Sequence, residues 1–109
     1  MSDTAQWAGV TFNVYRHAGE WNDVGGVYIF CGLNSSGQWV PIYIGQTDSF
    51  RNRIPRHEQW IPAVQLGATH VHALVVQQAA EQEQLERLLI ATFRPPLNTQ
   101  LKQSYFGRA

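Results

Sequence analysis

The pattern of hydrophobic and polar positions divides the chain into short segments with strand-like and helix-like periods. Residues 27–33 and 39–46 are rich in β-branched and aromatic residues, as strands usually are. The turn-forming residues 34–37 separate the two segments, which therefore predict an antiparallel hairpin. Pro41 has no backbone N–H to donate, so we expect the second strand to begin irregularly or to lie at a sheet edge.

Two further segments have the alternation of a strand. Residues 10–15 alternate apolar and polar side chains, which suits a short strand ahead of the hairpin. Residues 68–76 predict another strand, on which His70 and His72 share one face. No cysteine or third histidine follows at the spacing of a structural zinc site, so we expect both histidines to be packed or solvated.

The segment between these strands, residues 48–66, predicts helical structure interrupted by proline. We expect a short turn over 48–54 and then a helix with Pro55 in its first turn, where a proline is tolerated. Pro62 is expected to kink or break this helix, and Gly67 to end it.

Residues 78–93 predict the clearest helix of the chain. Its core-facing stripe follows helical spacing and consists of Leu85, Leu88, Leu89, Thr92 and Phe93. The two prolines at 95–96 are expected to end the helix.

The order β-β-α-β-α indicates an α+β domain. We expect a small, mostly antiparallel three-stranded sheet flanked by helices, with residues 10–15 as a candidate extra N-terminal strand. At 109 residues the chain has the size of a single domain, 1–109. Its core is expected over residues 26–98, with residues 1–25 as an N-terminal extension packed on it.

The composition places the chain among globular proteins. Hydrophobic residues make up 44% of it and aromatic residues 12%, which is ample for a packed core. A single cysteine, Cys31, excludes an internal disulfide, and residues 1–10 show no signal-peptide pattern. No apolar stretch is long enough to span a membrane. We therefore expect a cytoplasmic protein without membrane association.

The charge balance bears on whether the chain can bind nucleic acid. Eight basic and eight acidic residues give a formal net charge of zero, whereas domains that bind nucleic acid are usually basic. The distribution is uneven, because arginines gather over residues 51–57 and glutamates over residues 81–86. Such a surface can hold a phosphate locally while giving little long-range attraction, so we expect weak substrate binding.

Two tripeptides and the polar residues that follow them carry the most specific signal. Residues 26–28 read Gly-Val-Tyr and residues 43–45 read Tyr-Ile-Gly. The polar residues that follow are Arg53, His57, Glu86 and Asn98. The order and spacing of this set resemble the GIY-YIG nuclease family, whose members hydrolyse phosphodiester bonds of nucleic acid with one divalent metal. The resemblance extends from about Gly26 to Asn98.

The resemblance implies a role for each charged residue. Glu86 corresponds to the family's metal ligand, and a hard carboxylate oxygen suits Mg²⁺ or Mn²⁺. Arg53 corresponds to the phosphate-binding arginine, whose planar guanidinium can hold two phosphate oxygens. Arg51 and Arg56 are expected to add nucleic-acid contacts. Pro55 departs from the family's uninterrupted helix and puts the relative placement of Arg53 and His57 in question.

The resemblance also implies a catalytic pair of phenols. Tyr28 corresponds to a proposed general base and Tyr43 to the residue that positions the water or the phosphate. His57 is the alternative base, or else it orients Tyr28, because an imidazole titrates near neutral pH. Gly45 and Asn98 are expected to support the site, the first through close backbone approach and the second through hydrogen bonds.

These features predict a metal-dependent endonuclease acting on nucleic acid, with DNA favoured over RNA. The alternative is a catalytically weak or inactive module of the same fold that binds nucleic acid or protein, since a fold alone does not determine function. A homodimer or a protein partner is the expected source of any substrate specificity.

Overall fold

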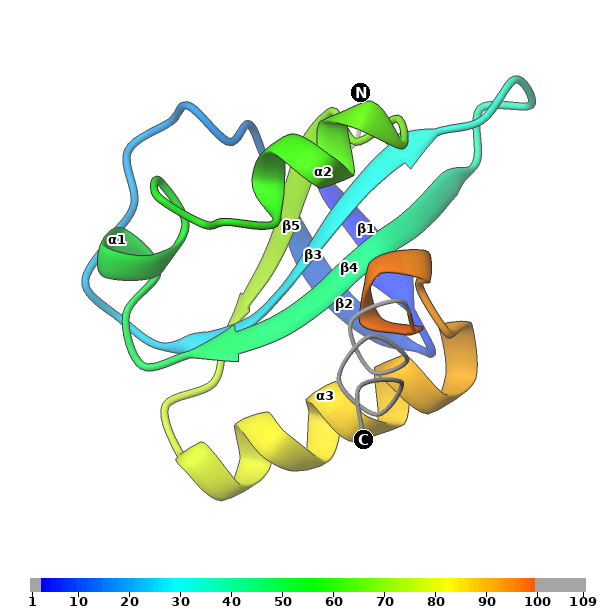
Figure 1. Cartoon of the computed structure of the whole chain (residues 1–109). Helices are drawn as coiled ribbons and strands as arrows, with labels where there is room; N and C mark the ends of the chain where they lie inside the picture. Colours follow the sequence, from blue (N-terminus) through cyan, green and yellow to red (C-terminus); the bar gives the residue numbers. More distant parts are fainter. Residues whose placement is uncertain (1–2, 100–109) are drawn as a thin grey trace, which may run out of the picture.

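The computed structural model describes residues 3–99, and its centre is a five-stranded antiparallel sheet with the strand order β1-β2-β5-β3-β4 (Figure 1). The strands are β1 (Thr4–Trp7), β2 (Val10–Tyr15), β3 (Gly26–Leu33), β4 (Trp39–Thr47) and β5 (His70–Val75). The helices are α1 (Phe50–Arg53), α2 (Trp60–Gln65) and α3 (Ala79–Phe93), followed by a helical turn over residues 96–99. The α+β class is confirmed, but the prediction of three strands was wrong.

The two additional strands come from the N-terminal segment. The strand predicted at residues 10–15 is β2, and it pairs with β5, placing Val14 opposite His72. The second addition, β1, forms a hairpin with β2 through Ala8 and Gly9, whose φ angles are 53° and 79°. Left-handed values at both turn residues match the twist of a tight hairpin. Alanine rarely adopts such a φ, so the sequence carries no ordinary turn signal there.

The hairpin of β3 and β4 lies where the sequence predicts it, with β4 at the edge of the sheet. Phe30 is opposite Tyr43 and Cys31 is opposite Pro41, so Ile42 is an extra residue that bulges out of the register. The proline therefore lies in an edge strand next to an irregularity, where its missing N–H removes no required hydrogen bond.

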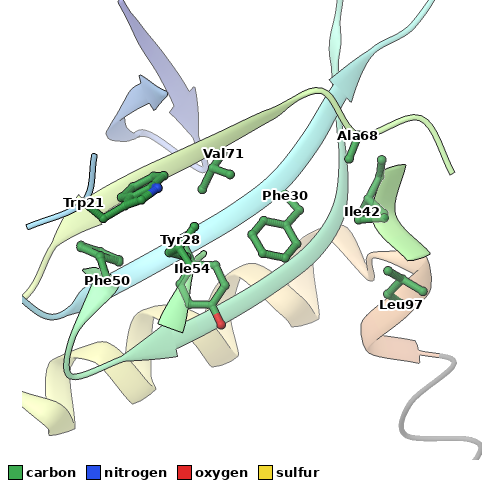
Figure 2. Packing of buried hydrophobic residues seen from close by; sticks show 11 residues of the cluster. Trp21, Tyr28, Phe30, Ile42, Phe50, Ile54, Ala68, Val71 and Leu97 are labelled. Carbon is green, nitrogen blue, oxygen red and sulfur yellow. The ribbon is translucent and has the colours of Figure 1, made fainter. Parts of the chain in front are cut away.

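The sheet is covered on both faces. Figure 1 shows α1 and α2 on one side and α3 on the other. The α1/α2 face buries a cluster whose side chains are drawn in Figure 2: Trp21, Tyr28, Phe30, Ile42, Phe50, Ile54, Ala63, Ala68, Val71, Ala73 and Leu97. The α3 face buries Trp7, Phe12, Val27, Ile29, Cys31, Ile44 and Leu89. Because β3 is buried on both faces, its residues are almost all apolar.

The region of α1 and α2 differs from the prediction. The helix expected to contain Pro55 in its first turn does not form; α1 ends before this proline and α2 begins at Trp60. Ser49 caps α1, its Oγ accepting from the Asn52 N–H at 3.2 Å. Pro62, not Pro55, occupies the first turn of a helix, where no intrahelical partner for its nitrogen is required.

The helix predicted at residues 78–93 is confirmed as α3, but part of its predicted core face was wrong. Leu88 is 51% exposed, whereas Gln82 is buried and its Nε2 donates to the Val76 carbonyl at 2.6 Å. Thr92 is also exposed. Within residues 3–99 no helix, α3 included, is long and apolar enough to cross a membrane.

Candidate active site

The Tyr28 side chain extends from β3 over Gly45 of the edge strand β4. The two residues are opposite each other in β3 and β4. A Cβ atom on Gly45 would lie 2.5 Å from the Tyr28 hydroxyl oxygen, closer than any real side chain allows. Figure 2 shows the hydroxyl of Tyr28 pointing across β4. The glycine therefore leaves the space through which Tyr28 extends.

Gly26 has a similar function at the start of β3. A Cβ atom there would lie 2.0 Å from the Leu74 carbonyl oxygen and 2.7 Å from the Phe50 ring. The glycine thus lets β5 and α1 pack closely against β3, and this packing holds the first turn of α1 beside the sheet. Two adjacent glycines, Gly25 and Gly26, are as typical of a turn as of a strand, and in the structure Gly26 is the first residue of β3.

His57 lies in the turn that follows α1, and its side chain is hydrogen-bonded to Tyr28. Its Nε2 lies 2.7 Å from the Tyr28 Oη, and both side chains are buried. The Gln59 backbone N–H donates to His57 Nδ1 at 3.0 Å. Because Nδ1 is an acceptor, the neutral ring carries its proton on Nε2 and donates it to Tyr28. Burial, and then the nearby Arg53 charge, lowers the pKa of His57 to about 4.

Tyr43 completes the aromatic group. Its ring centroid lies 6.3 Å from that of Tyr28 and 5.1 Å from that of His57. Burial raises the pKa of Tyr43, with the Arg53 charge opposing this effect. Burial also raises the pKa of Tyr28 far above its ordinary range, and the charges of Tyr43 and Glu86 add to the increase.

Arg53 is near both phenols but is already paired. Its Nη1 and Nη2 donate to the two carboxylate oxygens of Glu58, each at 2.7 Å. The Arg53 charge lowers the pKa of Tyr28 and of Tyr43, although burial outweighs it at both residues. Pro55 therefore does not separate Arg53 from His57; the turn that contains it brings His57 to Tyr28 and Glu58 to Arg53.

Glu86 is half-buried on α3 and faces β4. Gln46 Nε2 donates to its Oε1 at 2.9 Å, and its Oε2 has no hydrogen-bond partner within residues 3–99. Burial raises the pKa of Glu86, an effect that the Gln46 hydrogen bond opposes. The negative charge of Glu86 influences the pKa of both Tyr28 and Tyr43, so the three groups share one electrostatic environment.

Asn98 fastens the segment after α3 to the edge strand. Its Oδ1 accepts from the Ile44 N–H and its Nδ2 donates to the Ile44 carbonyl, both at 2.8 Å. The side-chain amide thus pairs with β4 as a neighbouring strand would. Ile44 lies between Tyr43 and Gly45, so this pairing supports the backbone at the centre of the site.

The remaining arginines have different surroundings. Arg51 is exposed and forms an ion pair with Asp23 at 3.2 Å. Asp23 also accepts from the Ser49 Oγ at 2.6 Å, so this pair braces the start of α1. Arg56 is exposed and has no ion pair within residues 3–99.

The structure therefore brings together Tyr28, Tyr43, Arg53 and His57 on the α1/α2 face, with Gly45 and Asn98 supporting them. Glu86 meets β4 from the α3 face through Gln46, and its charge reaches both phenols. Sequence reasoning missed Glu58 and Gln46. Nothing in the spacing of Glu58 reveals its pairing with Arg53, because the turn at Pro55 decides it. Gln46 is three residues after Tyr43, and residues an odd number apart in a strand point to opposite faces, so Gln46 faces α3 while Tyr43 packs on the α1/α2 face.

The Glu86 carboxylate suits a weakly bound divalent cation. Within residues 3–99 no group of three or more His, Cys, Asp or Glu side chains could ligate a metal ion. A single carboxylate with one free oxygen, as in Glu86, still fits Mg²⁺, which keeps most of its waters and often takes one or two protein carboxylates. Closed transition-metal sites need more ligands than this.

Comparison with known proteins gives matches among solved structures. The magnesium-bound GIY-YIG N-terminal endonuclease domain of UvrC from Thermotoga maritima is 31% identical, with a TM-score of 0.56; the match covers 70% of this chain and 84% of that one. An asparagine-to-alanine variant of the same domain, bound to its catalytic divalent cation, matches with 31% identity, coverage of 70% and 83%, and a TM-score of 0.56. A tyrosine-to-phenylalanine variant, also bound to its cation, matches with 32% identity, the same coverage and a TM-score of 0.55. No family model and no curated protein sequence matches the chain.

Proposed function

Because the chain belongs to the GIY-YIG nuclease family, we propose that it is a metal-dependent endonuclease that hydrolyses phosphodiester bonds of nucleic acid, with DNA favoured as substrate. The observation that carries this proposal is the shared electrostatic environment of Glu86 and the two phenols, which come from α3, β3 and β4. One carboxylate oxygen of Glu86, Oε2, has no hydrogen-bond partner within residues 3–99.

In this proposal Tyr28 is the general base and His57 supports it. The Nε2–H of His57 donates to the Tyr28 oxygen, and a donated hydrogen bond favours the phenolate over the phenol. His57 has no free acceptor, because the Gln59 N–H occupies Nδ1. The imidazole therefore cannot take the proton of a water without breaking that bond, whereas a Tyr28 phenolate can.

Deprotonation of Tyr28 is unfavourable in the protein without a bound cation. Burial raises the pKa of Tyr28, and the Arg53 guanidinium only partly offsets this. A divalent cation, Mg²⁺ or Mn²⁺, held by Glu86 would add positive charge beside the phenol and the phosphate oxygens. Arg53 would hold the phosphate and compensate the negative charge that develops on it. Tyr43 would orient the water or the phosphate.

The alternative is a module of the same fold that binds nucleic acid with little or no cleavage. The zero net charge and the pairing of Arg53 with Glu58 favour this alternative. Binding without metal-dependent cleavage would be its signature.

A plasmid-nicking assay tests the proposal. Supercoiled DNA would be incubated with the protein in separate reactions that contain Mg²⁺, Mn²⁺ or EDTA. We expect cleavage that requires the cation and that falls by at least about 100-fold in Glu86→Gln and in Tyr28→Phe. The matched control is Glu81→Gln, an exposed glutamate on the same helix, which should cleave as the parent does. Cleavage by Glu86→Gln at the parental rate would contradict the proposal.

A further inference from the structure

We propose that Glu58 is a built-in competitor for the phosphate at Arg53 and so determines how tightly the site holds its substrate. This inference rests on the proposed nuclease function, because it assigns a specificity-determining residue to the same site. It concerns a residue that is not among the polar set of the sequence motif.

Glu58 occupies both terminal nitrogens of the Arg53 guanidinium. Arg53 donates through both terminal nitrogens to both oxygens of Glu58, with two distances of 2.7 Å. A phosphate group uses the same parallel pair of donors when it binds an arginine. The carboxylate of Glu58 therefore takes the position that a phosphate would need for a bidentate contact. The Arg53 hydrogen bonds lower the pKa of Glu58 to about 2, so the competitor is charged at neutral pH.

The place of the pair in the fold links it to the phenols. Glu58 follows His57 directly, and the turn that joins α1 to α2 carries both residues. The Arg53 charge influences the pKa of Tyr28 and Tyr43, so the guanidinium is the cation of this aromatic group. An anion that approaches the phenols must therefore share Arg53 with Glu58 or displace it.

Displacement is feasible because the carboxylate is accessible. The Glu58 side chain is 63% exposed, whereas the Arg53 side chain is 37% exposed. Solvent can take over the carboxylate when it leaves, so the contact acts as an exposed ion pair rather than a buried one. Arg53 is the more enclosed partner and would remain beside the phenols.

The local charge supports competition. Without a bound cation, Glu58 cancels the charge of Arg53, so the pair offers a phosphate no net positive charge. Neutralising Glu58 alone removes one negative charge and frees the guanidinium. We therefore expect Glu58 to weaken substrate binding more than it affects the chemical step.

Inorganic pyrophosphate tests the competition without any need for cleavage. Its binding would be followed by NMR of the Arg53 Nε–H in the parent, in Glu58→Gln and in the control Glu83→Gln. The control also removes a glutamate from an arginine ion pair, the one with Arg87 at 3.1 Å. We expect Glu58→Gln to bind about five- to tenfold more tightly than the parent, and the control to change by less than about twofold. Equal affinity of parent and Glu58→Gln, or no binding by either, would overturn the inference.

DNA separates this inference from the proposed function. In a Glu86→Gln background with EDTA, fluorescence anisotropy should show tighter DNA binding for Glu58→Gln than for Glu83→Gln. In active protein, Glu58→Gln should lower KM and leave kcat within about twofold. A fall in kcat at unchanged KM would identify Glu58 as a residue that positions Arg53, and would overturn the competition. If Glu58→Gln binds pyrophosphate more tightly but the protein cuts no DNA, the nuclease function is refuted and the competition at Arg53 is not.

Discussion

Tyr28 and Gly45 face each other across β3 and β4 with no room for even one methyl group between them. The phenol occupies the volume that a side chain at position 45 would need. The tyrosine of the first motif and the glycine of the second motif are therefore one structural unit. Their separation in the sequence conceals this dependence, and the antiparallel register produces it.

Replacing Gly45 with alanine should move the phenol and disable the site. The new Cβ would overlap the Tyr28 hydroxyl, so we expect cleavage to fall by at least about 100-fold. The overlap should also lower the free energy of unfolding by about 1–3 kcal/mol. Gly19→Ala is the control, because its Cβ would meet its nearest neighbour at 3.4 Å. Urea unfolding and plasmid nicking measure the two effects; full activity of Gly45→Ala would refute the dependence.

The pH dependence of cleavage should distinguish the two candidate bases. Burial raises the pKa of Tyr28, so only a small phenolate fraction exists near neutrality, and kcat/KM should rise by about tenfold per pH unit through this range. The pKa of His57 is about 4, so a histidine base would give a rate that is already level above pH ~5. Single-turnover rates between pH 6 and 9 decide the matter. A flat profile would exclude Tyr28 as the base.

Acid should destabilise the fold through two buried histidines. Burial lowers the pKa of both His57 and His72 to about 4, below the ordinary value of 6.5. The unfolded chain therefore binds protons more readily, and stability is lost as the pH falls from about 6.5 towards 4. Each histidine contributes up to about 1.4 kcal/mol per pH unit.

Urea unfolding at several pH values measures this loss. His72 is fully buried, accepts from the Trp7 Nε1 at 2.9 Å and leaves its Nε2 without a partner within residues 3–99. His72→Phe should reduce the pH slope by about one proton, even if it lowers the stability at pH 7. An unchanged slope in this variant would show that His72 does not titrate with unfolding.

Removing the Asn98 amide should loosen the edge strand. Asn98→Ala loses two hydrogen bonds to Ile44, and we expect the free energy of unfolding to fall by about 1–3 kcal/mol. Cleavage should fall as well, because Tyr43 is adjacent to Ile44. Asn52→Ala, an exposed asparagine whose side chain has no hydrogen bond within residues 3–99, should leave stability within about 0.5 kcal/mol. Equal stability of the two variants would contradict this prediction.

Much of the scaffold follows from periodic patterns in the sequence. The hairpin of β3 and β4, the strand β5 and the helix α3 have apolar spacing strong enough to predict each element. Leu88 shows the limit of such patterns: it has the right spacing for the core, yet the direction from which α3 meets the sheet leaves it exposed and buries Gln82 instead. Periodicity does not encode the angle at which a helix packs.

The site was less accessible to sequence reasoning than the scaffold. The motif resemblance selected residues that the fold brings together, whereas their partners depend on turns whose geometry has no simple signal. The turn at Pro55 decides that Glu58 reaches Arg53 and that His57 reaches Tyr28. The backbone of Ala8 is a similar case, because an alanine with a φ of 53° builds the unexpected first strand.

The proposal of a single protein ligand, Glu86, has a practical meaning for anyone who prepares the protein. With Glu86 as the single protein ligand proposed, and no richer cluster within residues 3–99, a cation would exchange freely with the buffer. Elemental analysis of a purified sample would then report the history of its solutions rather than the needs of the enzyme. Screens that recognise metalloenzymes by co-purifying metal would overlook a protein of this kind.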